Sequence, residues 1–226
     1  MRRKESRAIQ MMKCVVVLLS LLSVGRSDPE SGCDRLVQPI TISNEQMLGR
    51  WLYIGGSTDL PGSRSLGHLM TSVWLDVTAT SQSNILNILQ TQRIYSDCSS
   101  LTYNATFENS TMLIEQPFHL KEVYLPTDCS DCLVAYEEVI SGTDTFTSLL
   151  LFSRRKSVSA VTQEMLMRQA ECLRMQSPIM INPNYEICPD NILPSEGLSA
   201  LNTVFEAKMG HRVARLLDSF FDMFVN

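Results

Sequence analysis

The sequence predicts an all-β protein: an eight-stranded up-and-down antiparallel barrel, one helix packed outside it, and an amphipathic helix at the C-terminus. Two observations carry this prediction. Short segments rich in β-branched and aromatic residues follow one another between turn signals, and one segment of helical periodicity comes only after them. Strands joined by hairpins close into a barrel that leaves no free sheet edge. An immunoglobulin-like sandwich is the alternative, but its Cys…Trp…Cys pattern is absent.

The expected strands lie close enough together for hairpin connections. Leu-Pro-Gly-Ser at 60–63, Ser-Gln-Ser-Asn at 81–84 and Ser-Gly-Thr-Asp at 141–144 are typical turn sequences. The predicted strands cover residues 50–58, 68–78, 84–95, 99–107, 111–116, 118–125, 132–140 and 145–153.

The first strand carries a steric signal. Gly49 ends a short run with helix-turn character, and Trp51 and Tyr53 then begin a strand. A large ring folds under the end of a barrel only if the backbone before it has no side chain in the way. Gly49 and Trp51 are therefore expected to close one end of the barrel.

The helix signal follows the last strand. Ser157 or Ser159 can cap a helix that Pro178 bounds. A single helix after a closed barrel has one sensible place, the outer wall. Its apolar positions are Val161, Met165, Leu166, Cys172 and Leu173.

The chain divides into a leader at 1–27, a barrel domain at 28–190 and a tail at 191–226. Lys13 precedes a short apolar run, and Ser27 suits a small-residue cleavage site. The run is shorter than the roughly 20 apolar residues of a membrane span. We therefore expect cleavage, secretion and an extracellular location.

Charge excludes one class of partner. Without residues 1–27 the chain keeps 13 basic and 23 acidic side chains, a formal charge of −10. Nucleic-acid binding needs a basic face, so that function is not expected. The balance suits a soluble extracellular protein.

Six cysteines follow the leader, an even number that predicts three disulfides with about 15 possible pairings. Cys129 and Cys132 have the spacing of a redox motif, but the βαβ context is absent, so a third disulfide, local or rearranged, is favoured. Asn104 and Asn109 begin two glycosylation sequons on an expected hairpin.

The tail has a pattern of its own. From Leu198 onward, apolar residues recur at steps of three and four and share one helical face. Three uses remain open: packing on the barrel or self-association, attachment to a lipid surface, and a disordered tail. The residues of this face are Leu201, Phe205, Met209, Val213, Leu216, Leu217, Phe220, Phe221 and Phe224.

The chain resembles the lipocalin family. Gly49-Arg-Trp51 opens the first strand, and Leu150-Leu-Phe-Ser-Arg154 ends the eighth. Within that family it is most similar to orosomucoid (α1-acid glycoprotein) and its fish relatives that bind saxitoxin and tetrodotoxin, over about residues 33–188. Apolipoprotein M is a more distant relative.

The resemblance implies roles for several residues. In lipocalins an arginine packs across the tryptophan of the closed end, and Arg154 matches it, with Arg155 as the fallback. The orosomucoid pattern pairs Cys33 with Cys172 and Cys98 with Cys188. Cys129 and Cys132, for which a mutual bond is the simplest pairing, have no counterpart there.

The chain also departs from orosomucoid at its pocket. The buried carboxylate of that protein falls at Gln90, and its pocket arginine falls at Ile114. The ligand preferences of orosomucoid therefore do not carry over.

The barrel lumen is the expected binding site, because eight strands enclose just enough space for one small ligand. Each candidate side chain has a plainer interpretation as core filling. The candidates are Tyr53, Trp74, Gln90, Gln92, Phe118, Leu120 and Tyr136.

Catalysis, cofactors and metals are not expected. Sequence patterns of serine hydrolases, zinc proteases and phosphate-binding loops are absent, and the three histidines are scattered. The catalytic lipocalin, prostaglandin D synthase, uses a free lumen cysteine, whereas three disulfides account for every mature cysteine here.

The functional prediction is a secreted, glycosylated carrier of a small, mostly apolar molecule, with Gln90, Gln92 and tyrosines orienting its polar end. Steroid-like, lysolipid and toxin-like ligands all remain open, the last by resemblance alone. The alternative is an association module for lipid particles or a protein, working through the C-terminal helix.

Overall fold

The computed structural model describes residues 29–60, 62, 67, 69–94, 97–115, 119–141 and 144–196. The predicted leader, Phe118 and the tail beyond 196 lie outside these residues. The chain divides into two units, 1–35 and 36–226. The architecture below is that of the second unit; helix α2 (Pro29–Val37) spans the boundary.

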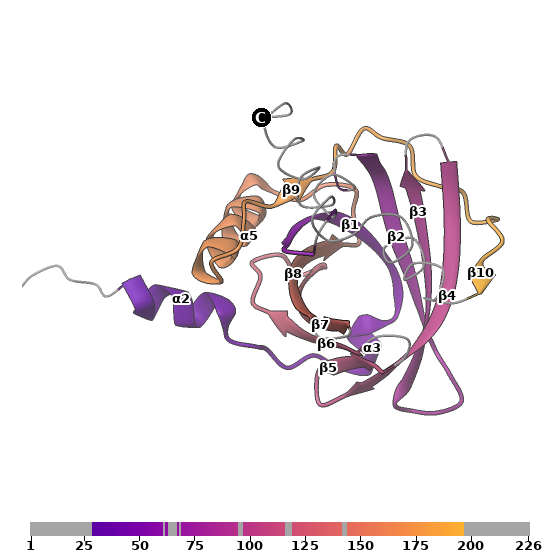
Figure 1. Cartoon of the computed structure of the whole chain (residues 1–226), viewed down its shortest axis with the longest axis horizontal. Coiled ribbons are helices and arrows are strands. Elements are labelled where there is room, and N and C mark those ends of the chain that lie inside the picture. The colour runs from indigo at the N-terminus through magenta and orange to yellow at the C-terminus, as the bar shows by residue number, and fades with distance from the viewer. Residues whose placement is uncertain are drawn as a thin grey trace, which may run out of the picture. The chain divides into compact units, whose positions relative to one another are not determined.

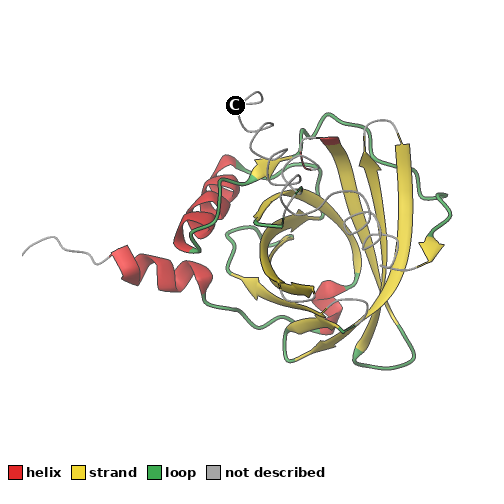
Figure 2. Ribbon diagram, viewed as in Figure 1, coloured by secondary structure: helices red, strands yellow, loops and turns green. Residues whose placement is uncertain are grey.

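The second unit is a closed antiparallel barrel in which each strand pairs with the next along the chain (Figures 1 and 2). Strand β1 pairs with both β2 and β8, which completes the ring. The predicted eight-stranded up-and-down barrel is confirmed. Its strands are β1 (Gly49–Thr58), β2 (Met70–Ala79), β3 (Ile85–Ile94), β4 (Asp97–Glu108), β5 (Thr111–Ile114), β6 (His119–Leu125), β7 (Cys132–Ser141) and β8 (Asp144–Ser153).

One end of the barrel is closed by the short helix α3 (Asn44–Met47). The Trp51 indole nitrogen donates to the Met47 carbonyl at 2.8 Å, and the Arg154 guanidinium carbon lies 3.4 Å from the centre of the Trp51 ring. Arg154 also donates to three backbone carbonyls around the junction of α3 and β1. These belong to Gln46 (3.1 Å), Leu48 (2.7 Å) and Arg50 (2.8 Å).

Gly49 is needed here for a reason that differs from the sequence argument. Its φ is +89°, a left-handed conformation that favours glycine, and an added Cβ would lie 3.2 Å from the Arg154 Nη1 atom. The side chain that a larger residue would displace is therefore the arginine, not the tryptophan ring.

Two apolar clusters lie on opposite faces of the barrel wall. The inner cluster, which includes Trp51, Phe107 and Leu133, fills the barrel from within. The outer cluster joins Leu149 and Leu151 of β8 to helix α5 (Ala160–Cys172), which covers the outside of the wall (Figure 1). Ser159 caps this helix by accepting from the Thr162 backbone nitrogen at 3.0 Å.

After α5 the chain runs along the outside of the barrel. Strand β9 (Ile179–Met180) pairs with β1 beside Gly55, where an added Cβ would lie 2.6 Å from the Ile179 carbonyl oxygen. Strand β10 (Ser195–Glu196) pairs in parallel with β4. Because β5 is short, this pairing covers part of the β4 edge that β5 leaves open.

Of the predicted tail at 191–226, the structure describes only residues 191–196. Residues 191–194 form no helix and β10 is extended. The apolar periodicity that suggested a helix begins at Leu198, beyond the described residues. None of the helices in the described ranges combines the length and hydropathy that a bilayer crossing requires.

Disulfides hold the C-terminal segment and the β6–β7 loop. Cys98 on β4 is bonded to Cys188, and Cys129 is bonded to Cys132. Cys33 and Cys172 are each disulfide-bonded as well.

The closed end yields a stability prediction. Replacing Arg154 by alanine removes three charge-assisted hydrogen bonds and the contact with Trp51. We expect the free energy of unfolding, measured by urea denaturation, to fall by about 2–3 kcal/mol, because such bonds and a partly desolvated cation–π contact each contribute about 1–2 kcal/mol and the side chain is partly exposed. Arg155→Ala is the matched control: it loses an ion pair with Asp131 that is partly exposed (2.6 Å), worth at most about 1 kcal/mol. Equal losses in the two variants would contradict the assignment.

Candidate functional site

Four of the residues that the sequence analysis placed in the lumen point into the barrel. Leu120 belongs to the inner cluster, and the Tyr53 ring lies 5.7 Å from the Phe152 ring, which packs against that cluster. Gln90 and Gln92 lie on the inward-facing side of β3, because side chains of a strand alternate between its two faces. The Gln90 amide donates to the Gln92 oxygen at 3.2 Å.

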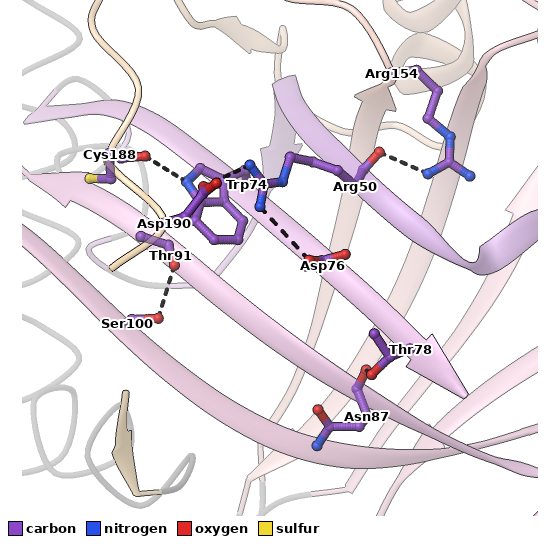
Figure 3. A network of polar contacts seen from close by, with 10 residues as sticks. All are labelled: Arg50, Trp74, Asp76, Thr78, Asn87, Thr91, Ser100, Arg154, Cys188 and Asp190. Carbon is purple, nitrogen blue, oxygen red and sulfur yellow. Dashed lines mark hydrogen bonds and ion pairs between the residues drawn. The ribbon is translucent and has the colours of Figure 1, made fainter. Parts of the chain in front are cut away.

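Trp74 points the other way, and its expected place in the lumen is corrected. Its indole nitrogen donates to the Cys188 carbonyl at 3.1 Å, and the Arg50 guanidinium carbon lies 4.0 Å from its ring centre (Figure 3). Arg50 in turn pairs with Asp190 at 2.8 Å and with Asp76 at 3.7 Å. Trp74 therefore anchors the C-terminal segment to the outer wall.

Tyr136 also lies outside, which corrects the second lumen assignment. It packs against the outer cluster and lines a shallow outer groove of about 240 Å³. The physical reason is register: Leu133 and Ala135 of the same strand belong to the inner cluster, so Tyr136 must face outward. The groove is also lined by Val37, Pro39, Lys121, Val123, Leu125, Glu138 and Leu173.

The same register turns two carboxyl groups inward, and the sequence analysis missed both. Glu122 on β6 is flanked in the alternation by Leu120 and Tyr124, which belong to the inner cluster. Glu137 on β7 lies directly opposite Glu122 across the strand pair. Like charges directly opposite one another destabilise a sheet, so two ionised carboxyls at these positions would destabilise the pairing of β6 with β7.

The surroundings of the two carboxyl groups raise their pKa values. Burial is the largest cause that raises the pKa of Glu122, and only 8% of Glu122 is exposed. Burial and then the charge of Glu122 raise the pKa of Glu137 well above its usual value, while hydrogen bonding to Ser148 on β8 lowers it. Two neighbouring carboxyl groups share one proton more readily than they both ionise.

Three tyrosines surround the carboxyls: Tyr53 on β1, Tyr103 on β4 and Tyr124 on β6. Burial and then the nearby carboxylates raise the pKa of all three phenols above the usual value. The Tyr103 hydroxyl donates to the Gln90 oxygen at 3.5 Å, which connects the glutamines with this group.

The interior is not filled evenly. Toward the α3 end, Trp51, Ile88 and Phe107 are almost fully buried. Other inward-facing side chains, of polar and apolar type, keep intermediate accessibility, so the interior is less closely filled around them. These are Tyr53, Leu75, Gln90, Tyr103, Glu137, Leu150 and Phe152.

A signal for the missed carboxyls was present in the sequence. Within 132–140, Leu133, Ala135 and Val139 share one alternation and Glu137 falls on it. If Tyr136 is expected inside the barrel, Glu137 is expected outside, because neighbouring residues of a strand face opposite sides of the sheet.

Cys129, Asp131 and Cys132 have ligand atoms close together, as in a metal site. The two sulfur atoms are bonded to each other, so they offer no thiolate. The Asp131 carboxylate is instead held by Arg155 at 2.6 Å.

Comparison with known proteins supports the fold. No family model and no curated protein match the chain. Among solved structures the chain is similar to the siderocalin Ex-FABP, which is described as functioning through dual ligand specificities. The TM-score is 0.55 at 14% sequence identity, over 63% of this chain and 97% of that chain. At this identity the similarity shows the fold alone, which is a closed antiparallel barrel of the lipocalin type.

The carboxyl pair predicts an unusual dependence of stability on pH. Above about pH 4.5, where an unfolded glutamate loses its proton, the folded protein still holds one, so the free energy of unfolding falls as the pH rises. Glu137→Gln removes this loss. We expect the variant to become progressively more stable than the wild type between about pH 5 and 8, by at most about 1.4 kcal/mol per pH unit.

Urea denaturation at several pH values measures this difference. Glu138→Gln is the control, because Glu138 is the next residue on the same strand and is exposed on the outer face. Parallel curves for Glu137→Gln and the wild type would show that the pair is not held in its protonated form.

Proposed function

We propose that this protein is a secreted carrier that binds one small, mostly apolar molecule inside the barrel. The observation that carries the proposal is that several inward-facing side chains remain partly accessible, among them the apolar Leu75, Leu150 and Phe152. Burial of apolar ligand surface contributes about 25 cal/mol per Å², and a few polar groups fix the orientation of the ligand.

Binding rather than catalysis is proposed. Every cysteine in the described part of the chain is disulfide-bonded, so none of these supplies a thiol nucleophile. The inward carboxyls lie among phenols and amides, an arrangement that recognises a polar group.

Three features support secretion and glycosylation. The apolar run that follows Lys13 has the character of a leader. Disulfides persist mainly in oxidising compartments. Asn104 is exposed on β4, and Asn109 is exposed in the β4–β5 turn with a φ of 50°. The finer kinship with orosomucoid stays a prediction from the sequence.

The association-module alternative depends on residues 197–226, which lie outside the described residues. No contact of the described residues favours it, so it enters as an outcome of an experiment. Deleting 197–226 should leave small-ligand affinity unchanged under the carrier function, whereas loss of lipid-particle or protein association on this deletion would favour the alternative.

Filling the interior tests the carrier function. Leu150→Trp adds a large ring to the inner wall, and we expect the affinity for the neutral fluorescent probe N-phenyl-1-naphthylamine to fall at least about 10-fold, equivalent to about 1.4 kcal/mol. Fluorescence titration measures the dissociation constant, and thermal melting checks that the variant folds.

Thr78→Trp is the matched control, since Thr78 is exposed on the outer face of β2. It should bind the probe as the wild type does. An unchanged affinity in a folded Leu150→Trp variant would show that the probe binds elsewhere, and absence of binding to the wild type would count against the carrier function.

A further inference from the structure

The groove on the outer wall of β6 and β7 is an apolar surface beyond the reach of helix α5. Val123 and Leu125 of β6, Tyr136 of β7 and Leu173 at the end of α5 line it. Val123 and Tyr136 are only partly buried. Leu125 belongs to the outer cluster, and Tyr136 and Leu173 pack against that cluster. Apolar side chains placed in the groove would therefore extend the outer cluster along the wall.

The rim of the groove carries one charge of each sign. Lys121 on β6 and Glu138 on β7 also line it, and they lie directly opposite each other in the strand pair. Both side chains are exposed. The groove therefore suits a segment that has an apolar face and polar faces of mixed charge, rather than a strongly acidic or basic partner.

The described chain ends close to this wall. Strand β10 lies beside β4, with Ser195 opposite Leu101 and Glu196 opposite Thr102 (Figure 1). Because the pairing is parallel, β10 points along β4 toward Thr106, where β5 pairs with the same edge. The strands that follow β5 around the wall are β6 and β7. From β4 to β7 the distance is three strand spacings, about 15 Å.

Segment 197–226 has the length and the pattern to fill the groove. As a helix it would extend about 45 Å, at about 1.5 Å per residue, which is more than the distance to β7. Its apolar residues, from Leu201 to Phe224, share one helical face. Its charged side chains are three acidic and three basic ones, so the segment has no net charge. They are Glu206, Asp218, Asp222, Lys208, Arg212 and Arg215.

We propose that segment 197–226 occupies the outer groove of its own chain, with its apolar face against Val123 and Tyr136. Charge disfavours an anionic lipid surface as the partner of this face, because helices that bind such surfaces are rich in Lys and Arg and this segment has no net charge. The covalent connection disfavours a second copy, because a tethered segment reaches an effective concentration in the millimolar range. The segment thus covers the outer wall and leaves the lumen to the cargo.

Hydrogen–deuterium exchange of the full chain, followed by mass spectrometry, tests the docking. In the wild type we expect amides of 197–226 to exchange at least about 10-fold more slowly than an unstructured peptide. Val123→Asp places a charge in the groove and should remove this protection. Thr78→Asp is the matched control, because Thr78 is exposed on the outer face of β2 and should leave the protection unchanged.

A second readout does not depend on a substitution in the barrel. Hydroxyl-radical footprinting compares the full chain with a chain that ends at Glu196. We expect the Tyr136 ring to be oxidised several-fold faster in the shortened chain, because its cover is gone. Tyr185, which is 48% exposed and lies away from the groove-lining residues, should be oxidised at the same rate in both.

Each contrary result overturns the docking. These results are an unprotected segment in the wild type, protection that survives in a folded Val123→Asp variant, and Tyr136 oxidation that the deletion leaves unchanged. Protection that rises with protein concentration would assign the segment to a second copy instead. Protection that appears only with phosphatidylcholine–phosphatidylserine vesicles would assign it to a membrane. Binding of N-phenyl-1-naphthylamine in the lumen is measured separately, so the carrier function stands or falls independently.

Discussion

Strand alternation in a closed barrel is the constraint on which the rest of this structure depends. Every second side chain of eight strands enters one enclosed space, so the identity of the inward residues decides whether that space is solid or hollow, apolar or charged. Here Trp51, Ile88 and Phe107 are almost fully buried, whereas inward-facing tyrosines, glutamines and Glu137 stay partly accessible. The interior therefore combines closely packed apolar side chains with partly accessible polar ones.

Contacts outside the lumen hold the strands of the barrel wall in place. Arg154 holds the backbone of α3 and β1 at the closed end, and Trp74 with Cys188 holds the C-terminal segment against β2. Arg154, Trp74 and Cys188 are among the residues that stand out in the sequence as an arginine after the last strand, a tryptophan and a cysteine. These residues thus stabilise the scaffold, whereas Glu122, Glu137 and several tyrosines face the interior.

Most of the fold follows from local sequence signals. Turn residues and β-branched segments predict all eight strands, and Ser159 and Pro178 bound the helix, because these signals act over a few residues. The positions of the candidate site residues are harder to predict than the strands. The sequence places Gln90, Gln92, Tyr53 and Leu120 in the lumen together with Trp74 and Tyr136. Large aromatic rings, however, bury equally well under a covering segment or helix. Glu137 depended on the register of β7, which the long-range pairing with β6 and β8 decides.

The central claim is that this barrel carries a small, mostly apolar molecule. The most direct measurement is mass spectrometry of the protein isolated from its native fluid, first under native and then under denaturing conditions. We predict one small molecule per chain, with a largely apolar body, that is released on unfolding. A protein that comes out with no small molecule bound would contradict this claim.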